Sequence, residues 1–424
     1  MQSIKLPYGK SQVELNIPNE RLNAVLVSNI EGYKPTGTEE SIVRNSLENP
    51  IGSKRLSILS KDVKKVLLIT SDHTRPVPSK VTIPLLLEEI RKFNPLVEVK
   101  ILIATGCHRP STKEEVISKF GIEIVNREEL VMHISRDYPN MVYKGVLPSG
   151  GELWLNSLVD WADLVVSEGF IEPHFFAGFS GGRKSILPGI ASLKTVLANH
   201  CSDFIADPNS RSGILVGNKV HKDMIFAAQV AKLEFILNVV LNEKKEVINA
   251  FSGDSEKAHI EGCAFVSSLS RVRAVYSEIV IATNGGYPLD QNIYQAVKGM
   301  TTAAATVKDK GVIIMVAQCE DGHGGEEFCN WFKGVSSVQE LVRKIEGIPQ
   351  SETIEDQWEA QMLSNILLKY EVILVSDKCD PELIKSMFMH HAMTVSEALE
   401  MAYKVTSCDA KITVIPDGVS IIVE

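Results

Sequence analysis

Four polar segments of this sequence follow short apolar runs and carry the side chains best suited to chemistry. In chain order these side chains are Asp72, Arg75, His108, His174, Lys184, His200, Tyr294, Gln295 and Lys298. Imidazole, with an unperturbed pKa of about 6.5, both accepts and donates a proton near neutrality. The arginine fork matches a carboxylate, which it binds through two hydrogen bonds. The set is typical of an enzyme site that moves protons on a small carboxylate.

The two histidines His108, in GCHRPST, and His174, in EPHFF, share a position just after an apolar run. A single histidine at such a position is more often a capping or hydrogen-bonding residue. Two in equivalent positions favour a pair of acid/base groups, because a proton relay with two faces needs one imidazole on each side of a carbon. The sequence leaves open whether the two rings face each other.

A carboxylate clamp is indicated by Arg75 and by the segment around Lys298. Arg75 lies in a turn that Pro76 and Pro78 stiffen. Lys298 lies four residues after Tyr294 and three after Gln295, so on a helix all three share one face. The alternative for both groups is solvated surface, but the stripe of Tyr, Gln and Lys after a Gly-Gly turn favours a site.

The segment GFSGGRKS, residues 178–185, resembles a phosphate-binding loop but lacks one required glycine. Arg183 stands directly before Lys184, where the loop motif needs glycine. Gly181 and Gly182, with the two cations, would still suit an anion-binding turn.

His200 closes the stretch SLKTVLANH, which predicts a short helix. It suits either a helix C-terminus or a metal such as nickel, copper or zinc. No second histidine follows four residues later, and the chain has no HExxH motif or CxxC pair. A metal bound here would therefore take most of its ligands from outside the protein.

Composition excludes several classes of protein. The net charge is −9 and no basic cluster occurs, which argues against nucleic acid as a partner. No secretory signal is recognisable, and no run approaches the ~20 apolar residues that span a bilayer. The 7 cysteines are scattered, which is typical of a reducing cytoplasm. We therefore expect a cytoplasmic protein with neither nucleic-acid nor membrane partners.

The elements that position these residues read as an α/β fold. Apolar runs of strand length occur at 66–70, 97–105, 164–167, 235–241, 278–283, 312–318, 371–376 and 411–415. Helical patterns separate them, including one from Ser79 and one with a capping box from Ser111 to Glu114. Such alternation predicts mainly parallel sheets covered on both faces.

The length of 424 residues predicts two α/β domains. The boundary falls near residues 265–277, where a helical pattern gives way to a strand. Residues 1–268 are assigned to a Rossmann-like N-terminal domain that carries the histidines and Lys184. Residues 269–424 are assigned to a C-terminal domain that closes the cleft. Ligands of open α/β sheets bind beyond the carboxyl ends of the strands, where the polar segments lie.

Taken together, the segments SDHTRPVPS, ATGCHRPST, HFFAGFSGGRKSILPGI, LANH and TNGGYPLDQNIYQAVKGM resemble the nickel-dependent lactate racemase family. The resemblance runs from the opening LPYG to the closing PDGVSIIVE and so covers essentially the whole chain. It implies an isomerase that carries a nickel pincer nucleotide, the pyridinium-3,5-dithiocarboxylic acid mononucleotide. Maturation proteins would supply this cofactor.

The resemblance also implies residue roles. Lys184 would anchor the cofactor covalently and His200 would bind nickel, while Asp72, Gly181 and Gly182 would belong to the cofactor environment. His108 and His174 would be the paired acid/bases. The substrate would be held by Arg75, Tyr294, Gln295 and Lys298.

The reaction implied is the interconversion of D- and L-lactate by proton-coupled hydride transfer through pyruvate. Two alternatives stay open: a racemase or epimerase of another 2-hydroxy acid, and a phosphate-ester-binding transferase built on GFSGGRKS. A non-catalytic nickel or nucleotide carrier is disfavoured, because a carrier has no need of both His108 and His174.

Overall fold

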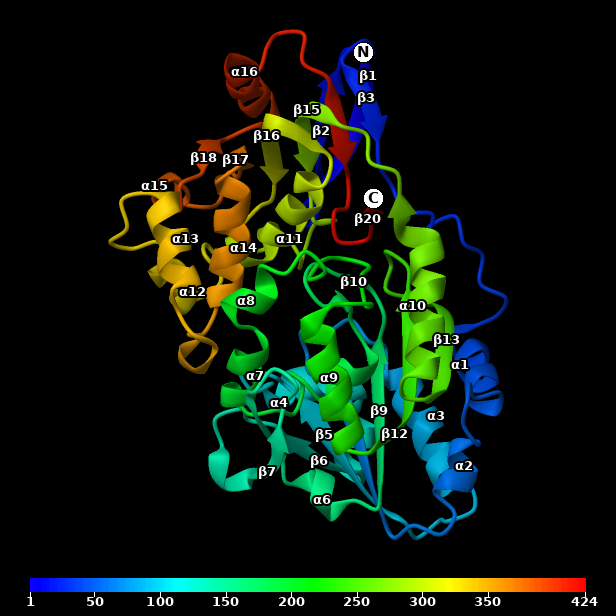
Figure 1. The fold of residues 1–424 in the computed structure, drawn as a ribbon. Coiled ribbons are helices and arrows are strands. Elements are labelled where there is room, and N and C mark those ends of the chain that lie inside the picture. The colour runs from blue at the N-terminus through cyan, green and yellow to red at the C-terminus, as the bar shows by residue number, and fades with distance from the viewer. The chain divides into compact units, whose positions relative to one another are not determined.

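A computed structural model describes all 424 residues, which form two compact units. The N-terminal unit comprises residues 29–199 and 208–269, and the C-terminal unit comprises residues 1–28, 200–207 and 270–424. Each unit contains a 6-stranded sheet (Figure 1). The predicted α/β class with two domains and mainly parallel sheets is confirmed.

The sheet of the N-terminal unit is parallel except at one edge. Its order is β13 (Val247–Asp254), β12 (Leu233–Leu241), β9 (Leu164–Phe170), β4 (Lys65–Ser71), β5 (Glu98–Ala104) and β6 (Glu129–Met132). Only β13 runs antiparallel to its neighbour. Each apolar run predicted in this part of the chain forms the body of one of these strands.

The helices of this unit bury the sheet. They are α1 (Glu39–Glu48), α2 (Leu56–Leu59), α3 (Ser79–Arg91), α4 (Lys113–Phe120), α5 (Ile122–Arg127), α6 (Leu158–Trp161), α7 (Leu193–Asn199), α9 (Lys219–Val230) and α10 (Lys257–Ser270). Val66 and Leu68 of β4 share one core with Ile83 and Leu86 of α3. Leu67, which points to the opposite face, is also fully buried. Burial on both faces explains why the run is continuously apolar.

Parallel pairing decides where the polar segments go. β9, β4 and β5 are direct neighbours and run in the same direction. Their carboxyl ends therefore lie together at one edge of the sheet, and the segments after residues 71, 104 and 170 all begin there.

The sheet of the C-terminal unit is parallel throughout. Its order is β18 (His390–Ala392), β17 (Glu371–Val375), β16 (Val307–Val316), β15 (Ser277–Ala282), β19 (Ile412–Ile415) and β3 (Leu22–Val25). Alternate residues face two separate cores: Val280 lies with α11 (Ile293–Ala304) and α14 (Gln357–Leu367), and Ile281 with α16 (Val395–Val405). The remaining helices are α8 (Ser202–Ile205), α12 (Glu326–Asn330), α13 (Val338–Glu346) and α15 (Pro381–Ser386).

Residues 1–28 lie in the C-terminal unit, although the sequence analysis assigned them to the first domain. β3 pairs with β19 through Val25 and Val414, so the N-terminus supplies an edge strand (Figure 1). The hairpin of β1 (Gln2–Tyr8) and β2 (Ser11–Ile17) covers the same core as Ile281. Such pairings between distant segments leave no local pattern. The division after Leu269 lies beside the predicted boundary.

Small β-pairs complete the fold, formed by β7 (Met141–Val146) with β8 (Glu152–Asn156), β10 (Pro173–His174) with β11 (Gly178–Phe179), and β14 (Arg271–Val272) with β20 (Ile422–Val423). None of the helices combines the length and apolar character needed to cross a bilayer.

The capping box before α4 lies one residue later than predicted. Thr112 caps the helix and Glu115 completes the box, in place of Ser111 and Glu114. Both pairs fit the Ser/Thr-x-x-Glu motif, so sequence cannot choose between them. Ser111 instead makes a hydrogen bond with His73, 2.8 Å from Oγ to Nδ1.

The central strand β4 gives a test of the buried sheet. Replacing the fully buried Leu68 by alanine should lower the free energy of unfolding by about 2–5 kcal/mol, because it leaves a cavity between β4 and α3. Chemical denaturation followed by circular dichroism measures this. Leu96→Ala is the control, since Leu96 is 93% exposed and the change should cost no more than about 0.5 kcal/mol. Equal losses in the two variants would contradict the described core.

Candidate active site

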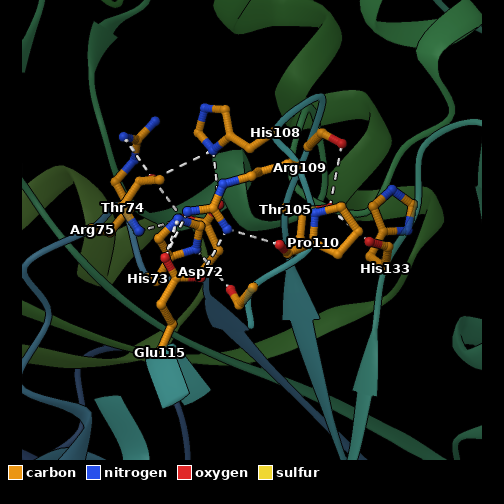
Figure 2. A network of polar contacts seen from close by, with 12 residues as sticks. Asp72, His73, Thr74, Arg75, Thr105, His108, Arg109, Pro110, Glu115 and His133 are labelled. Atoms are coloured by element: carbon orange, nitrogen blue, oxygen red, sulfur yellow. Dashed lines mark hydrogen bonds and ion pairs between the residues drawn. The ribbon is translucent and has the colours of Figure 1, made fainter. Parts of the chain in front are cut away.

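The turns after β4 and β5 are joined by a carboxylate–imidazole pair. Asp72 is buried, and its Oδ2 lies 2.8 Å from Nδ1 of the exposed His108 (Figure 2). Burial by itself would raise the pKa of Asp72, but the hydrogen bond and charge of His108, with Arg75 nearby, hold that pKa well below its usual range. Asp72 is therefore a carboxylate that accepts from the Nδ1–H group, which leaves Nε2 of His108 with a lone pair.

Hydrogen bonds within the turn hold Asp72 in place. The backbone N–H and the hydroxyl of Thr74 both donate to Asp72 Oδ1, at 3.1 and 2.6 Å. Arg75 Nη1 donates to the Thr74 hydroxyl at 3.2 Å, and Lys119 Nζ donates to the Arg75 carbonyl at 3.1 Å. These hydrogen bonds hold both the backbone of Arg75 and its guanidinium group.

A second pairing at this edge joins His174 and Lys184. His174 lies in the short hairpin of β10 and β11, and its Nδ1 accepts from the backbone N–H of Ala177 at 3.2 Å. Its Nε2 lies 3.2 Å from Nζ of the partly exposed Lys184. The Phe176 ring packs edge-on against the imidazole, with the centroids 4.6 Å apart. The imidazole is therefore held from two sides.

The glycine-rich turn before Lys184 is organised by its own chain. Gly182 N–H donates to Asn238 Oδ1 at 2.7 Å. Arg183, only 1% exposed, donates to the carbonyls of Ala177 and Phe179 at 2.7 and 2.8 Å. These donors are already used, so the structure does not support them as anion contacts. Gly181 has φ +78°, where an added Cβ would lie 2.7 Å from the Phe170 carbonyl.

The two pairings are tied together through the backbone. Gly106, two residues before His108, donates its N–H to the Gly189 carbonyl at 3.0 Å, and Gly189 N–H donates to the Lys184 carbonyl at 3.1 Å. The structure thus brings five of the predicted site residues to one edge of the N-terminal sheet: Asp72, Arg75, His108, His174 and Lys184.

Four predicted side chains lie in the C-terminal unit: His200, Tyr294, Gln295 and Lys298. Tyr294, Gln295 and Lys298 form the predicted stripe on α11, where all three are partly exposed. Lys298 Nζ donates to Gln295 Oε1 at 2.6 Å. His200 is buried against Trp358 of α14, with the ring centroids 5.0 Å apart. The Trp358 indole N–H also donates to the Tyr294 hydroxyl at 3.1 Å, which connects His200 to the α11 stripe.

Comparison with known proteins decides the family. Residues 8–213 match the lactate racemase N-terminal domain, and residues 272–423 match the lactate racemase C-terminal domain. A lactate racemase of Thermoanaerobacterium thermosaccharolyticum is 55% identical over 423 residues, covering 100% of this chain and 99% of the relative. A lactate racemase of Lactiplantibacillus plantarum is 52% identical over 424 residues, covering 100% of both.

The chain belongs to the lactate racemase family. It is therefore an isomerase, as the sequence analysis predicted. The solved lactate racemase apoprotein of T. thermosaccharolyticum has a TM-score of 0.97 and 54% identity, with 100% of each chain covered. A structure from Thermotoga maritima has a TM-score of 0.68 at 20% identity, with 92% of this chain and 100% of that chain covered, and it supports the fold alone.

The side chains that could bind a metal ion do not form a complete site among themselves. No group of three or more His, Cys, Asp or Glu side chains is placed to hold a metal ion. The buried imidazole of His200 can supply one ligand, and the partly exposed amine of Lys184 offers a point of covalent attachment.

Helix α14 was missed by the sequence analysis. Besides Trp358, it supplies Gln361, whose amide donates to the Ser202 carbonyl at 3.1 Å, two residues beyond His200. The helix thus connects the His200 segment with the α11 stripe. Its sequence, QWEAQMLSNIL, carries several polar residues at positions that are buried in the structure. Polar residues at positions where helical periodicity expects apolar ones were the signal that could have identified it.

The same helix buries a carboxyl group without a hydrogen-bond partner. Glu359 is fully buried, and neither of its side-chain oxygens accepts or donates a hydrogen bond. Burial raises the pKa of Glu359 well above its usual range, with Lys298 opposing the shift and Asp356 adding to it. Glu359 is therefore neutral in the folded chain at pH values where it ionises in the unfolded chain.

Glu359 should make the folded chain less stable as the pH rises. The free energy of unfolding is highest below the pKa of about 4.3 that Glu359 has in the unfolded chain. Above that pH it falls by up to about 1.4 kcal/mol per pH unit, until the pH reaches the raised pKa of Glu359 in the folded chain. Glu359→Gln should remove this slope. Melting temperatures between about pH 4 and pH 8 measure it, with the exposed Glu346→Gln as control. Parallel pH profiles for wild type and Glu359→Gln would show that Glu359 ionises normally.

Proposed function

We propose that the chain interconverts D- and L-lactate by proton-coupled hydride transfer to a nickel pincer nucleotide, through pyruvate. The observation that supports this most directly is the Asp72–His108 pair at the same sheet edge as His174 and Lys184. Two imidazoles near one attachment point suit a reaction in which the substrate hydroxyl loses its proton to one ring and regains a proton from the other. Full-length similarity to two lactate racemases supports the substrate.

Lys184 would hold the cofactor covalently and His200 would bind its nickel. When bound, the cofactor would take up the C2 hydride of the substrate and return it. Gly181 and Gly182 would serve it by shaping the turn before Lys184, since the Gly182 N–H is already used. Asp72 would act on the cofactor environment through His108. Maturation proteins would be the partners that deliver the cofactor.

The proton steps fall to the two histidines. His108 Nε2, with its lone pair, would accept the proton of the substrate hydroxyl, and the Asp72 carboxylate would stabilise the imidazolium. After hydride returns to the other face of pyruvate, His174 would supply the proton for the opposite enantiomer. The carboxylate and oxygen of the substrate would be held by Arg75, Tyr294, Gln295 and Lys298.

A phosphate-ester transferase is disfavoured by the GFSGGRKS segment. Its Arg183 and Gly182 donors are bound within the protein and cannot wrap a phosphate. A racemase of another 2-hydroxy acid remains the alternative, because the residues on the substrate side chain decide that preference. The cytoplasmic location stays a prediction.

The function is tested by activity and mass together. Chain co-expressed with maturation proteins should racemise lactate faster than other 2-hydroxy acids in a panel of enantiopure substrates, followed by loss of optical rotation. Intact-mass and peptide analysis should place the cofactor on Lys184. Lys184→Ala should abolish both racemisation and the cofactor adduct. Lys113→Ala, a change at an exposed lysine, should leave racemisation and the adduct unchanged. Activity with unmodified Lys184 would refute the covalent anchor.

Asp72→Asn should lower kcat for racemisation by roughly 10²–10⁴-fold, because an amide no longer fixes the Nδ1–H tautomer of His108. Thr74→Val is the comparison variant: it removes the hydroxyl that donates to Asp72 and accepts from Arg75 but keeps the Asp72 carboxylate, so the loss should be only a few-fold. Initial rates in both directions measure the effect. Similar losses in the two variants would mean that the carboxylate has no special role.

A further inference from the structure

The contact between His174 and Lys184 defines the protonation of both groups. Nδ1 of His174 accepts a hydrogen bond from Ala177 N–H, and a backbone N–H can only donate. Nδ1 therefore carries the lone pair, and the proton of the neutral ring lies on Nε2. The hairpin pairing of His174 with Gly178 fixes this turn, so the ring keeps its orientation.

The Nε2–H group then needs an acceptor, and the atom in front of it is Nζ of Lys184, 3.2 Å away. An ammonium group has three donors and no acceptor, so it cannot complete this hydrogen bond. A neutral amine can, through its lone pair. The geometry therefore matches imidazole N–H donating to an uncharged lysine.

Phe176 and Arg183 act on the charge of this amine in opposite senses. The Phe176 ring lies 5.7 Å from Nζ, and a ring face at that distance favours the ammonium by only about 0.5–1 kcal/mol. The adjacent Arg183 brings a buried guanidinium, whose hydrogen bonds go to backbone carbonyls and to the rings of His221 and His259. A second positive charge in the same loop disfavours the ammonium.

We propose that His174 holds Lys184 as a neutral, nucleophilic amine in the cofactor-free chain, so that Lys184 accepts an acyl or thioacyl group near neutral pH. The inference rests on the proposed function only for the identity of that group. The Lys184 nitrogen releases the hydrogen bond from His174 Nε2–H and uses the same lone pair to form a bond to the carbonyl or thiocarbonyl carbon of an activated ester or thioester. The bond from that carbon to the leaving group breaks, and the leaving group departs with the electron pair and one amine proton.

Acylation also changes what His174 does. The amide or thioamide nitrogen has no basic lone pair, so it no longer accepts from Nε2–H. The same N–H group becomes available to a substrate oxygen. His174 would therefore first prepare the anchor and then serve as the acid of the reaction.

The test labels the full-length, cofactor-free chain with the N-hydroxysuccinimide ester of acetic acid and measures acetylation of each lysine by peptide mass spectrometry. Between about pH 6 and pH 9 the exposed Lys113 should react about tenfold faster per pH unit, because the neutral fraction of a solvated lysine amine rises about tenfold with each unit in this range. Lys184 should already react at its full rate at about pH 7, with little further increase at higher pH. Identical pH profiles for Lys184 and Lys113 would overturn the proposal.

Two variants separate His174 from its surroundings. His174→Phe keeps a ring but removes the donor, so Lys184 should slow at least about tenfold at neutral pH and follow the profile of Lys113. His174→Gln retains an N–H donor and should keep part of the neutral-pH reactivity. Unchanged Lys184 reactivity in His174→Phe would refute the role of His174. The wild-type profile decides the proposal even if a variant does not fold.

The pH profile of Lys184 acetylation and the cofactor adduct on Lys184 test the two proposals separately. Cofactor found on Lys184 after co-expression, together with an ordinary pH profile in the apo chain, would overturn the neutral amine alone. A neutral-pH profile without any cofactor adduct would overturn the anchor and leave the amine proposal standing.

Discussion

Parallel pairing of β9, β4 and β5 is the constraint on which the candidate site depends. Neighbouring strands that run in the same direction end at the same edge of the sheet. The segments after residues 71, 104 and 170 therefore lie side by side, although they are far apart in the sequence. Buried apolar side chains on both faces of the sheet hold the strands in this order. The backbone link from Gly106 to Gly189 then closes the distance between the turns.

Hydrogen-bond partners give the two histidines opposite tautomers. His108 meets a carboxylate at Nδ1 and therefore exposes a lone pair at Nε2. His174 meets a backbone N–H at Nδ1 and therefore presents a proton at Nε2. In the proposed reaction one ring would serve as a base and the other as a donor, although the two side chains are chemically identical. The difference lies in which neighbour, Asp72 or Ala177, contacts the same ring atom.

In the C-terminal unit, α14 has the corresponding supporting role. Trp358 contacts the His200 ring and donates to Tyr294, while Gln361 holds the segment that follows His200. The buried carboxyl of Glu359 lies on the same helix without hydrogen-bond partners. Polar groups buried in this way cost stability. These groups lie on the helix that contacts both the His200 ring and the α11 stripe.

The sequence by itself determined the α/β class, eight strands of the two large sheets, the α11 stripe and the chemical types of the candidate site residues, because these follow from local periodicity and from side-chain chemistry. Only the tertiary structure placed residues 1–28 at the edge of the C-terminal sheet and chose Thr112 over Ser111 as the cap. It also turned Arg183 inward, against the expectation of an anion contact. The placement of residues 1–28 depends on a partner that is distant in sequence, and the same is true of the Asp72–His108 pair. Ser111 and Arg183 also have distant partners, His73 and His259. Local patterns reveal which groups a segment carries, whereas protonation and orientation are decided by what the fold places against them.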